Sequence, residues 1–438
     1  MSPAASNGGQ PGRGRPVRSV ALLLNNPFLT DSRAWKMART LGGAGYDVTV
    51  IARAQDGLPE REEAHGFRVV RVAQPNPFAR VPSTRLPPGD DAGARPGSAS
   101  RRASKLQRTS AASVGRAVQA ARYLRLTRLW ARDIERAVGP QDVWQAEGLV
   151  ALPVGLELRR RAGGATIYDS RDLDVQSARF ARLPGPWRRL LERRERAWAR
   201  SVDALISVSR PYADVLERSF DRTPTIVMNG PPDFTPPDPP ERRFHDRLGL
   251  PPGTPVVMYL GLIMAGRGIE QLCAAIGEVP GAVLIVAGFG VDYDRYRAAA
   301  AVLPHADRIH FLPGIAPDEI LAWTASADIS AMPVQGDTLN HQLNTPTKLF
   351  DAMGAGVPVV ASDLPGMGPI VHDTGCGELC DPEDPADIAR AIRTILDAPP
   401  ERRAAYREAC LAAARGPYAW ERQAAALLEL YRGLRVTS

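Results

Sequence analysis

The chain has 438 residues, of which 55 are Lys or Arg and 48 are Asp or Glu, so its formal net charge is +7 at neutral pH. This length is too great for one ordinary hydrophobic core and predicts two domains. No run of 18 apolar residues occurs, so we expect no membrane-spanning helix. The four cysteines are too few for a disulfide framework, and Cys376 and Cys380 have no second Cys or His pair that would complete a metal site.

The first half of the chain predicts one domain, over residues 17–232. Residues 1–16 lack the apolar segment of a secretory signal and are expected to form a disordered tail. Strand and helix then alternate, which is typical of a parallel sheet covered on both faces. Residues 80–112 are rich in Pro, Gly, Ser and Arg and predict a flexible basic insertion. The expected strands are 17–26, 47–53, 66–72, 142–148, 165–171, 204–210 and 223–230, and the expected helices are 32–45, 114–138, 150–162, 186–202 and 210–219.

The second half repeats this alternation and predicts a second domain, over residues 244–415. A proline-rich stretch at 233–243 is expected to be the linker, and residues 416–438 are expected to form a C-terminal helix. The expected strands are 254–261, 282–288, 308–314, 328–334 and 357–362, and the expected helices are 269–279, 292–302, 317–326 and one that begins near 346. Two doubly wound domains of this kind bind ligands at the carboxyl ends of their strands, which face a cleft between the domains.

The segment "NTPTKLFDAMGAGVPVVAS", at 344–362, contains a candidate anion site. Thr345 is a plausible N-cap, and Pro346 suits the first helical position. Lys348 follows in the first turn, where a cation opposes the helix dipole, and this placement is explained if an anion binds there. Asp351 lies on the same face and is suited to accept hydrogen bonds from the hydroxyl groups of a ribose. The alternative interpretation is an ordinary Lys–Asp pair on the surface of a helix.

Two further loops follow buried strands. The loop "LGLIMAGRGIEQL", at 260–272, offers glycines for close backbone approach and Arg267 for a diphosphate, although a glycine turn with a solvated arginine is the alternative. The loop at 22–33 contains no glycine, which makes a dinucleotide-dependent dehydrogenase improbable.

Polar side chains also follow two strands of the first half. Gln145 and Glu147 end the strand 142–148, and Asp169, Arg171 and Asp172 end the next one. A carboxylate in this position is suited to orient or deprotonate an acceptor hydroxyl group. The alternative is that these residues cap the helices that follow.

The excess positive charge is concentrated in the first half. Residues 101–132 contain nine basic residues and no acidic one, and 187–200 interleave Arg with Trp and Leu. These runs are either solvated helix faces or a surface for an anionic membrane or an acidic acceptor. No nucleic-acid-binding motif accompanies them, so we expect no nucleic acid partner.

The loops together resemble those of glycosyltransferase family 4, whose GT-B fold consists of two Rossmann-like domains facing across a cleft. The resemblance extends from about residue 18 to 433, without the 80–112 insertion. It rests on the order of "DSRAWKMARTLGGAGYDVTVIA", "IYDSRDL", "ALISVSRPYADVL", "IVMNGPP", "YLGLIMAGRGIEQL" and "TPTKLFDAMGAGVPVVAS". The final "YAWERQAAALLELY" is similar to the family's helix that crosses back to the first domain.

This resemblance implies a retaining transfer of a sugar from a UDP- or GDP-sugar to a hydroxyl acceptor, without a cofactor or metal. The acceptor would be a lipid-linked glycan, a polysaccharide or a natural product. Arg267, Lys348, Asp351 and Glu147 would be the catalytic residues. The implied donor site comprises Gly261, Arg267, Gly288, Phe311, Leu312, Asn344, Thr345, Lys348, Leu349 and Asp351, and the implied acceptor side comprises Asn26, Asp31, Arg33, Glu147, Asp169 and Arg171.

The sequence departs from the family at several positions. Leu343 stands where much of the family has a sugar-binding Glu, Leu262 stands where many members have Arg, and Asp351 replaces Glu. A nucleotide-sugar epimerase and a non-catalytic glycan- or membrane-binding protein therefore remain alternatives. We expect a cytoplasmic location, with peripheral contact at the inner membrane face as an additional hypothesis.

Overall fold

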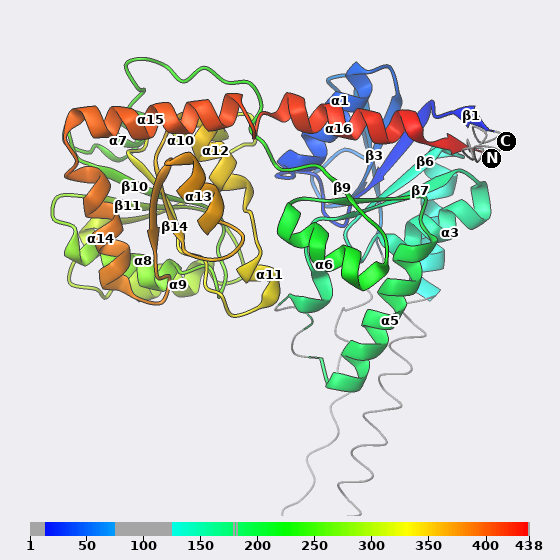
Figure 1. Cartoon of the computed structure of the whole chain (residues 1–438), viewed down its shortest axis with the longest axis horizontal. Helices are drawn as coiled ribbons and strands as arrows, with labels where there is room; N and C mark the ends of the chain where they lie inside the picture. Colours follow the sequence, from blue (N-terminus) through cyan, green and yellow to red (C-terminus); the bar gives the residue numbers. More distant parts are fainter. Residues whose placement is uncertain (1–13, 75–124, 178–179, 181–182, 437–438) are drawn as a thin grey trace, which may run out of the picture.

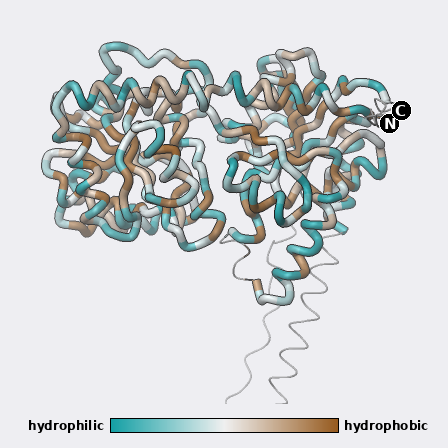
Figure 2. The backbone as a smooth tube through the Cα atoms, in the orientation of Figure 1, coloured by the Kyte–Doolittle hydropathy of each residue, from teal (hydrophilic) through white to brown (hydrophobic). Residues whose placement is uncertain are grey.

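The computed structural model describes residues 14–74, 125–177, 180 and 183–436, which form two large β-sheets with helices above and below each of them (Figure 1). The expected 80–112 insertion lies outside the described residues, as does most of the expected N-terminal tail. The apolar residues are concentrated in the strands at the centre of each half (Figure 2). The architecture is therefore α/β, with two domains of Rossmann-like layering.

Among the described residues, the N-terminal sheet has eight strands, and every neighbouring pair is parallel except β4 and β5. The antiparallel β4 was not predicted, because its sequence "REEA" is polar throughout and lies at the exposed sheet edge. In spatial order the strands are β4 (Arg61–Ala64), β5 (Phe67–Val72), β3 (Asp47–Arg53), β2 (Ser19–Leu23), β6 (Val143–Glu147), β7 (Ala165–Ser170), β8 (Ala204–Ser207) and β9 (Thr225–Ile226).

The C-terminal sheet has six strands, all parallel. In spatial order they are β12 (Ile309–Leu312), β11 (Val283–Phe289), β10 (Val256–Leu262), β13 (Ile329–Met332), β14 (Val359–Ser362) and β15 (Gly377–Cys380). The strands β2 and β10 are the first strands of the two large parallel arrays, and each lies centrally in its sheet. The strand order therefore reverses at β2/β6 and at β10/β13, and the loops that leave these strands border a crevice in each domain.

The helices connect the strands and cover both faces of each sheet. In the N-terminal domain they are α1 (Ser32–Gly43), the helical residues 125–138, α3 (Leu152–Ala162), the short η1 (Asp174–Gln176), α5 (Gly185–Ser201) and α6 (Arg210–Phe220). In the C-terminal domain they are α7 (Arg243–Leu248), α8 (Ile269–Ala275), η2 (Ile276–Glu278), α9 (Tyr293–Ala300), η3 (Ala306–Arg308), α10 (Ile320–Thr324), α11 (Leu339–Gln342), α12 (Thr347–Ala355), α13 (Gly368–Thr374), α14 (Pro385–Leu396) and α15 (Pro400–Arg415).

The chain returns to the N-terminal domain through α16 (Trp420–Gly433). Trp420 Nε1 donates a hydrogen bond of 2.9 Å to Thr40 Oγ1 of α1. After α16, β16 (Arg435–Val436) pairs with β1 (Arg15–Pro16). Arg15 and Pro16, which we had assigned to the disordered tail, are therefore ordered, because this pairing and a 2.8 Å bond from Arg15 Nη1 to Asp142 Oδ2 hold them in place.

In the described part of the chain, no helix is both long enough and apolar enough to cross a lipid bilayer.

Candidate functional site

Two cationic side chains lie close enough to interact at the carboxyl ends of the C-terminal strands. Arg267 belongs to the loop between β10 and α8, and Lys348 stands in the first turn of α12. Lys348 Nζ and Arg267 Nε are both buried without a hydrogen-bond partner among the described residues. Burial, and after it the charge of Arg267, holds the pKa of Lys348 well below its usual range. A bound anion would provide the missing partner and offset the repulsion between the two cations.

The ring of Tyr259 forms the floor beneath Lys348. Lys348 Nζ lies 3.5 Å from the centroid of this ring. Tyr259 Oη donates a hydrogen bond of 2.7 Å to Leu262 O, which fixes the ring at the end of β10. A cation–π contact offsets part of the desolvation of the ammonium group but leaves its N–H groups without acceptors. The hydrogen-bonding capacity of this nitrogen is therefore unused among the described residues.

The helix α12 begins one residue later than predicted. Pro346, expected at the first helical position, is the N-cap residue, and no side chain caps this end of the helix. Thr345, expected as the cap, instead has its Oγ1 atom buried without a partner in the described structure. The backbone amides of Thr347 and Lys348 come first in the helix and have no acceptor within it. This helix end consequently favours an anion in the same place as the two cations.

Two glycines bring the ends of β10 and β11 close together. A Cβ atom on Gly288 would lie 1.8 Å from Gly261 O, so no side chain is possible there. Gly261 has a φ of +130°, a conformation that other residues rarely adopt, and a Cβ atom on it would meet nothing within 4 Å. The backbone at Gly261 therefore borders open space into which a ligand can enter.

Asp351 lies one turn further along α12 and is 7% exposed. Burial raises the pKa of its carboxyl group to about 6, and the charge of Lys36 from the N-terminal domain opposes this rise. Asp351 and Lys348 do not form the surface ion pair of the alternative interpretation, because the Asp351 side chain and the Lys348 ammonium group are both buried and the latter has no hydrogen-bond partner in the described structure.

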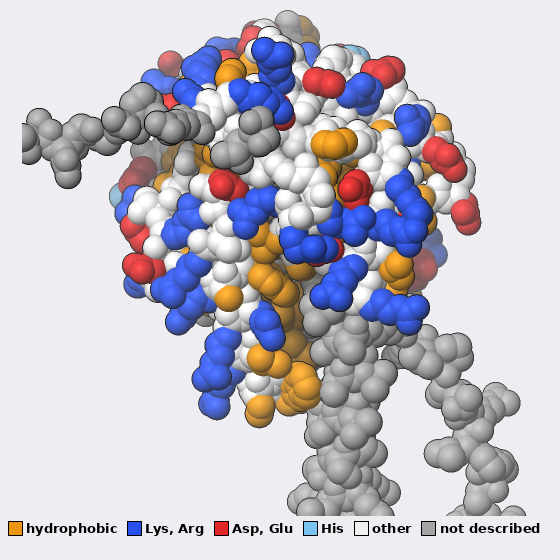
Figure 3. All heavy atoms as spheres, turned by 90° about the vertical axis from the view of Figure 1, so that its right-hand side faces the viewer, with side chains coloured by type: hydrophobic (Ala, Val, Ile, Leu, Met, Phe, Trp, Pro, Cys, Tyr) orange, Lys and Arg blue, Asp and Glu red, His pale blue; other side chains and the backbone are white. Residues whose placement is uncertain are grey.

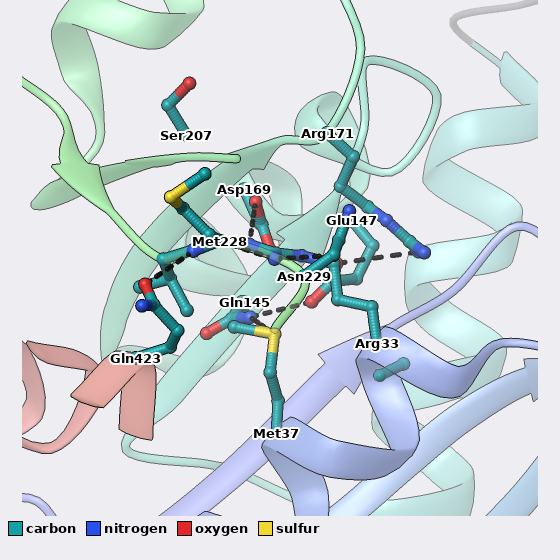
Figure 4. Close-up of polar contacts among 12 residues, drawn as sticks. Arg33, Met37, Gln145, Glu147, Asp169, Arg171, Ser207, Met228, Asn229 and Gln423 are labelled. Atoms are coloured by element: carbon teal, nitrogen blue, oxygen red, sulfur yellow. Dashed lines mark hydrogen bonds and ion pairs between the residues drawn. The ribbon is translucent and has the colours of Figure 1, made fainter. Parts of the chain in front are cut away.

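On the opposite side, Arg33 and Asp169 form a buried ion pair (Figure 4). Arg33 Nε and Nη2 donate to the two carboxylate oxygens of Asp169 at 3.0 and 3.2 Å. Arg33 Nη1 also donates to Val227 O and to Asn229 Oδ1, at 2.7 and 3.0 Å. Both charged groups are thus occupied by the protein itself, and they tie α1 to the ends of β7 and β9. Neither group is free to bind an acceptor.

Asp31 and Arg171 form a second pair nearer to the surface. Arg171 Nη1 and Nη2 each donate a hydrogen bond of 2.7 Å to Asp31. Asp31 also caps α1 by accepting from Ala34 N, and it accepts from Asn26 Nδ2 at 2.8 Å. Although burial would raise the pKa of Asp31, Arg171 and these donors lower it to about 2. The Arg171 side chain is 25% exposed and the Asp31 side chain 4%, so the arginine is the more accessible member of this pair.

Glu147 lies beneath Arg171 at the end of β6 (Figure 4). Its Oε1 atom accepts a hydrogen bond of 2.7 Å from Gln145 Nε2, whose Oε1 in turn accepts from Tyr431 Oη of α16 at 2.6 Å. Glu147 Oε2 lies 3.7 Å from Arg171 Nη1 and has no hydrogen-bond partner among the described residues. Burial, with the charge of Asp169 next, raises the pKa of Glu147 to about 8. Burial and the charge of Asp169 thus favour the protonated form of this acid.

Asn340 of α11 joins the two domains across the cleft. Its Oδ1 atom accepts from Leu173 N at 2.7 Å, and its Nδ2 atom donates to Asp172 Oδ1 at 3.2 Å. Tyr212 Oη of α6 lies 2.7 Å from Asn340 O and 2.8 Å from Oδ1. The carboxyl ends of the two sheets consequently face each other at contact distance. Within the described residues, no group of three His, Cys, Asp or Glu side chains is arranged to hold a metal ion.

The chain is similar to known glycosyltransferases. The family model for glycosyl transferases of group 1 matches residues 240–410. The chain is 28% identical to the D-inositol 3-phosphate glycosyltransferase of Xylanimonas cellulosilytica over 52% of its own length and 56% of the relative, and 26% identical to that of Acidothermus cellulolyticus over 91% and 84%. The first alignment therefore spans little more than half of that relative. A GDP-mannose-dependent α-(1-6)-phosphatidylinositol monomannoside mannosyltransferase of Mycolicibacterium smegmatis is 29% identical over 69% of this chain and 80% of the relative.

The fold is shared with solved structures. Sucrose-phosphate synthase of Thermosynechococcus elongatus has a TM-score of 0.71 at 19% identity, covering 95% of this chain and 98% of the other. Anabaena HepE in complex with UDP and glucose has a TM-score of 0.67 at 16% identity, covering 95% and 100%. The chain is a glycosyltransferase of the GT-B fold. The predicted fold class and enzyme class are thereby confirmed.

Not every predicted donor residue of this glycosyltransferase is placed to touch a ligand. The Leu349 side chain is fully buried in the core, and its amide donates within the helix to Pro346 O, so it is removed from the predicted set. Phe311 and Leu312 are half-buried in β12, whereas Phe289, which we did not predict, is 49% exposed at the end of β11. Asn344 is half-buried just before α12.

The cleft of the glycosyltransferase also contains residues that sequence patterns did not indicate. The sequence predicts Tyr259 only as part of the strand 254–261 and Lys36 only as part of the helix 32–45. Leu343, at the position where relatives have a Glu, packs against the hydrophobic core of the N-terminal domain. A leucine there extends the contact that Asn340 makes between the domains.

Proposed function

We propose that this glycosyltransferase transfers a sugar from a UDP- or GDP-sugar to a hydroxyl acceptor with retention of configuration. The observation that carries the proposal is the half-buried pair Arg267 and Lys348 beside an uncapped helix end. Arg267 Nε and Lys348 Nζ are buried without partners in the described structure. A pyrophosphate has the charge and the acceptor oxygens that this arrangement lacks. The complex of HepE with UDP and the GDP-mannose dependence of the mycobacterial relative support a nucleotide diphosphate donor.

The residues that bind the other parts of the nucleotide sugar are assigned by their position around Arg267 and Lys348. Asp351, one turn beyond Lys348, accepts the ribose hydroxyl groups in this proposal. The pyrophosphate lies over Gly261, where the backbone borders open space. The base lies toward Gly288 and the half-buried Phe311, with the exposed ring of Phe289 beside it.

In the proposed mechanism, the bond between the anomeric carbon and the β-phosphate oxygen breaks while the acceptor oxygen forms its bond on the same face of the sugar. The acceptor proton passes to an oxygen of the leaving diphosphate, so no protein base is required. Arg267, Lys348 and the amides of α12 stabilise the charge that develops on the leaving group. These fixed cations supply the electrostatic stabilisation in our proposal, which assigns no step to a metal ion.

The proposal predicts that release of free UDP or GDP depends on an acceptor. UDP- and GDP-sugars are first screened for those that raise the melting temperature, since a ligand that binds the folded state stabilises it. The selected donor is then incubated with inositol phosphates or with phosphatidylinositol vesicles, and NMR reports the anomeric configuration of the product. We expect a retained configuration and an unchanged rate after addition of a chelator. The absence of any stabilising nucleotide sugar, or nucleotide release that is independent of acceptor, would contradict the proposal.

We also propose that the N-terminal domain contacts an anionic membrane, where a lipid-linked acceptor would lie. Leu129 and Leu190 are 38% and 45% exposed on two Arg-rich helices, 125–138 and α5. Figure 3 shows an apolar strip bordered by Lys and Arg side chains on the outer face of this domain. Such a surface combines apolar insertion with attraction to anionic headgroups.

The membrane proposal predicts co-flotation with vesicles that contain phosphatidylglycerol but not with vesicles of phosphatidylcholine alone. Leu190→Glu should weaken this binding about tenfold or more, because it places a charge at an exposed apolar position of α5 and adds repulsion from the headgroups. Val291→Glu is the matched control, since Val291 is 91% exposed on the other domain. Equal flotation of Leu190→Glu and wild type would refute the proposed contact.

A further inference from the structure

The chain passes between the two domains twice, once after Asn229 and Gly230 and once just before Trp420. These two connections cross next to Lys36 of α1. Lys36 is only 4% exposed, and its Nζ atom donates to Asn229 O at 3.2 Å and to Gly230 O at 2.5 Å, where the chain leaves the N-terminal domain. Nζ also lies 5.0 Å from the ring centroid of Trp420, where the chain returns to this domain. One lysine thus contacts both connections.

The crossing itself is closely packed. Trp420 N donates to Pro231 O at 3.3 Å, and a Cβ atom on Gly230 would lie 2.1 Å from Tyr418 O. On the other side, a Cβ atom on Gly354 of α12 would lie 2.7 Å from Pro231 Cβ. Because Gly354 is three residues after Asp351, both residues lie on the same face of α12. The geometry therefore brings the carboxylate of the C-terminal domain toward the lysine of the N-terminal domain.

At this crossing, a cation of the N-terminal domain and a carboxylate of the C-terminal domain influence each other. Lys36 is the charged group that acts on Asp351 and favours its ionised form. The groups that act on Lys36 are Asp351, Arg33 and Asp31, and the last two have opposite effects. Burial lowers the pKa of Lys36 to about 8, so the lysine remains largely charged at pH 6 to 7. Asp351 has lost most of its contact with water and depends on this charge from the other domain.

We propose that Lys36 is a positioning residue for donor binding, which acts across the domain boundary by keeping Asp351 ionised to accept the ribose hydroxyl groups. The inference rests on the proposed function, because it takes Asp351 as the ribose-binding carboxylate. It assigns to the acceptor domain a direct influence on donor affinity. It also makes that influence depend on the packed crossing, since Lys36 is held there by the carbonyl groups of Asn229 and Gly230.

The test compares the dissociation constants of UDP and GDP for wild type and Lys36→Gln between pH 5.5 and 8. Glutamine can still donate to a backbone carbonyl but has no charge. Loss of a neighbouring opposite charge raises a carboxyl pKa by about one unit. At pH 6, the ionised fraction of Asp351 would fall from about one half to about one tenth, so we expect about 5-fold weaker binding at pH 6 and nearly equal binding at pH 8.

Three controls separate charge from structure. Lys36→Arg should restore the wild-type profile. Arg39→Met removes an exposed cation of the same helix, which stacks on Trp35. The dissociation constant of this variant should equal that of wild type at every pH tested. In an Asp351→Asn background, Lys36→Gln should no longer have a pH-dependent effect.

The possible outcomes distinguish the inference from the proposed function. If wild type binds neither UDP nor GDP, the proposed function is wrong and the inference falls with it. If wild type binds and the ratio for Lys36→Gln is the same at all pH values, whether one or larger, Lys36 does not control the ionisation of Asp351 and the inference is overturned. A ratio that grows only as the pH falls supports it.

Discussion

Lys348→Met should lower kcat/KM by about 100- to 1,000-fold, which corresponds to about 2.7–4 kcal/mol of transition-state stabilisation, and should at the same time make the free protein more stable. The loss of activity follows because the proposed leaving diphosphate develops its charge beside this ammonium group. The gain in stability follows because Lys348 Nζ is buried without a hydrogen-bond acceptor in the described structure.

The sign of the stability effect follows from the pKa. The pKa of Lys348 is lowered in the folded protein by burial and by Arg267. At neutral pH the unfolded chain therefore holds this proton more firmly than the folded chain does, which costs the folded state free energy. A methionine of similar length removes that cost and retains contact with the ring of Tyr259. We expect a gain in unfolding free energy of the order of 1 kcal/mol.

Steady-state kinetics with the selected donor and urea denaturation without ligand measure the two effects. Arg422→Met is the matched control, because Arg422 is an exposed cation on α16 and should affect neither quantity. Retained activity in Lys348→Met would remove Lys348 from the site. A loss of both activity and stability would show that Lys348 is an ordinary structural residue.

The arrangement of elements could be predicted to a large extent, because buried parallel strands are continuous apolar runs. The strand β3 has the predicted limits, 47–53, and the predicted strands of the second half overlap β10 to β14, with ends that differ by up to two residues. The prediction was wrong where a local pattern had no apolar period. The polar β4 was not recognised, and α11, of four residues, is too short to show a helical period.

The site was predictable as a set of loops but not as a set of contacts. The positions of Arg267, Lys348 and Asp351 after buried strands indicated an anion site, and the structure places these three residues at the same sheet edge. No local pattern indicates that Lys348 contacts the ring of Tyr259, which stands 89 residues earlier in the chain. Nor does a local pattern place Lys36 at the crossing of the two domain connections. These contacts depend on tertiary packing, which sequence spacing does not contain.

On the acceptor side, too, the sequence predicted the positions of charged residues but not their partners. Asp31, Arg33, Asp169 and Arg171 were predicted to lie on the acceptor side. Asp169 and Arg171 end a predicted strand, and the family resemblance implied all four. The structure instead pairs Arg33 with Asp169 and Arg171 with Asp31, across 136 and 140 positions. Charged residues at strand ends are compatible with either role, and only the three-dimensional partners distinguish them.

The pairing of Arg33 with Asp169 predicts that Arg33→Met destabilises the protein by about 3–5 kcal/mol, since it leaves Asp169 buried without its counter-ion. The Arg33 and Asp169 side chains are 2% and 0% exposed. Removal of Arg33 also takes the donor from Val227 O and Asn229 Oδ1. Urea denaturation of the variant measures this cost. The second substitution Asp169→Asn, made in the Arg33→Met variant, should recover part of it, because it removes the uncompensated charge.

Arg68 and Asp47 provide a matched exposed pair in the same domain. Their nitrogen–oxygen distance is 2.6 Å, but their side chains are 45% and 60% exposed. Arg68→Met should therefore cost less than about 1 kcal/mol, since water screens the charge that remains. If Arg33→Met cost no more than Arg68→Met and instead raised KM for the acceptor, Arg33 would be a binding residue after all. A loss of stability confined to Arg33→Met assigns this pair to holding α1 against the ends of β7 and β9, and leaves Arg171 as the partly exposed arginine of the two pairs at the acceptor side of the cleft.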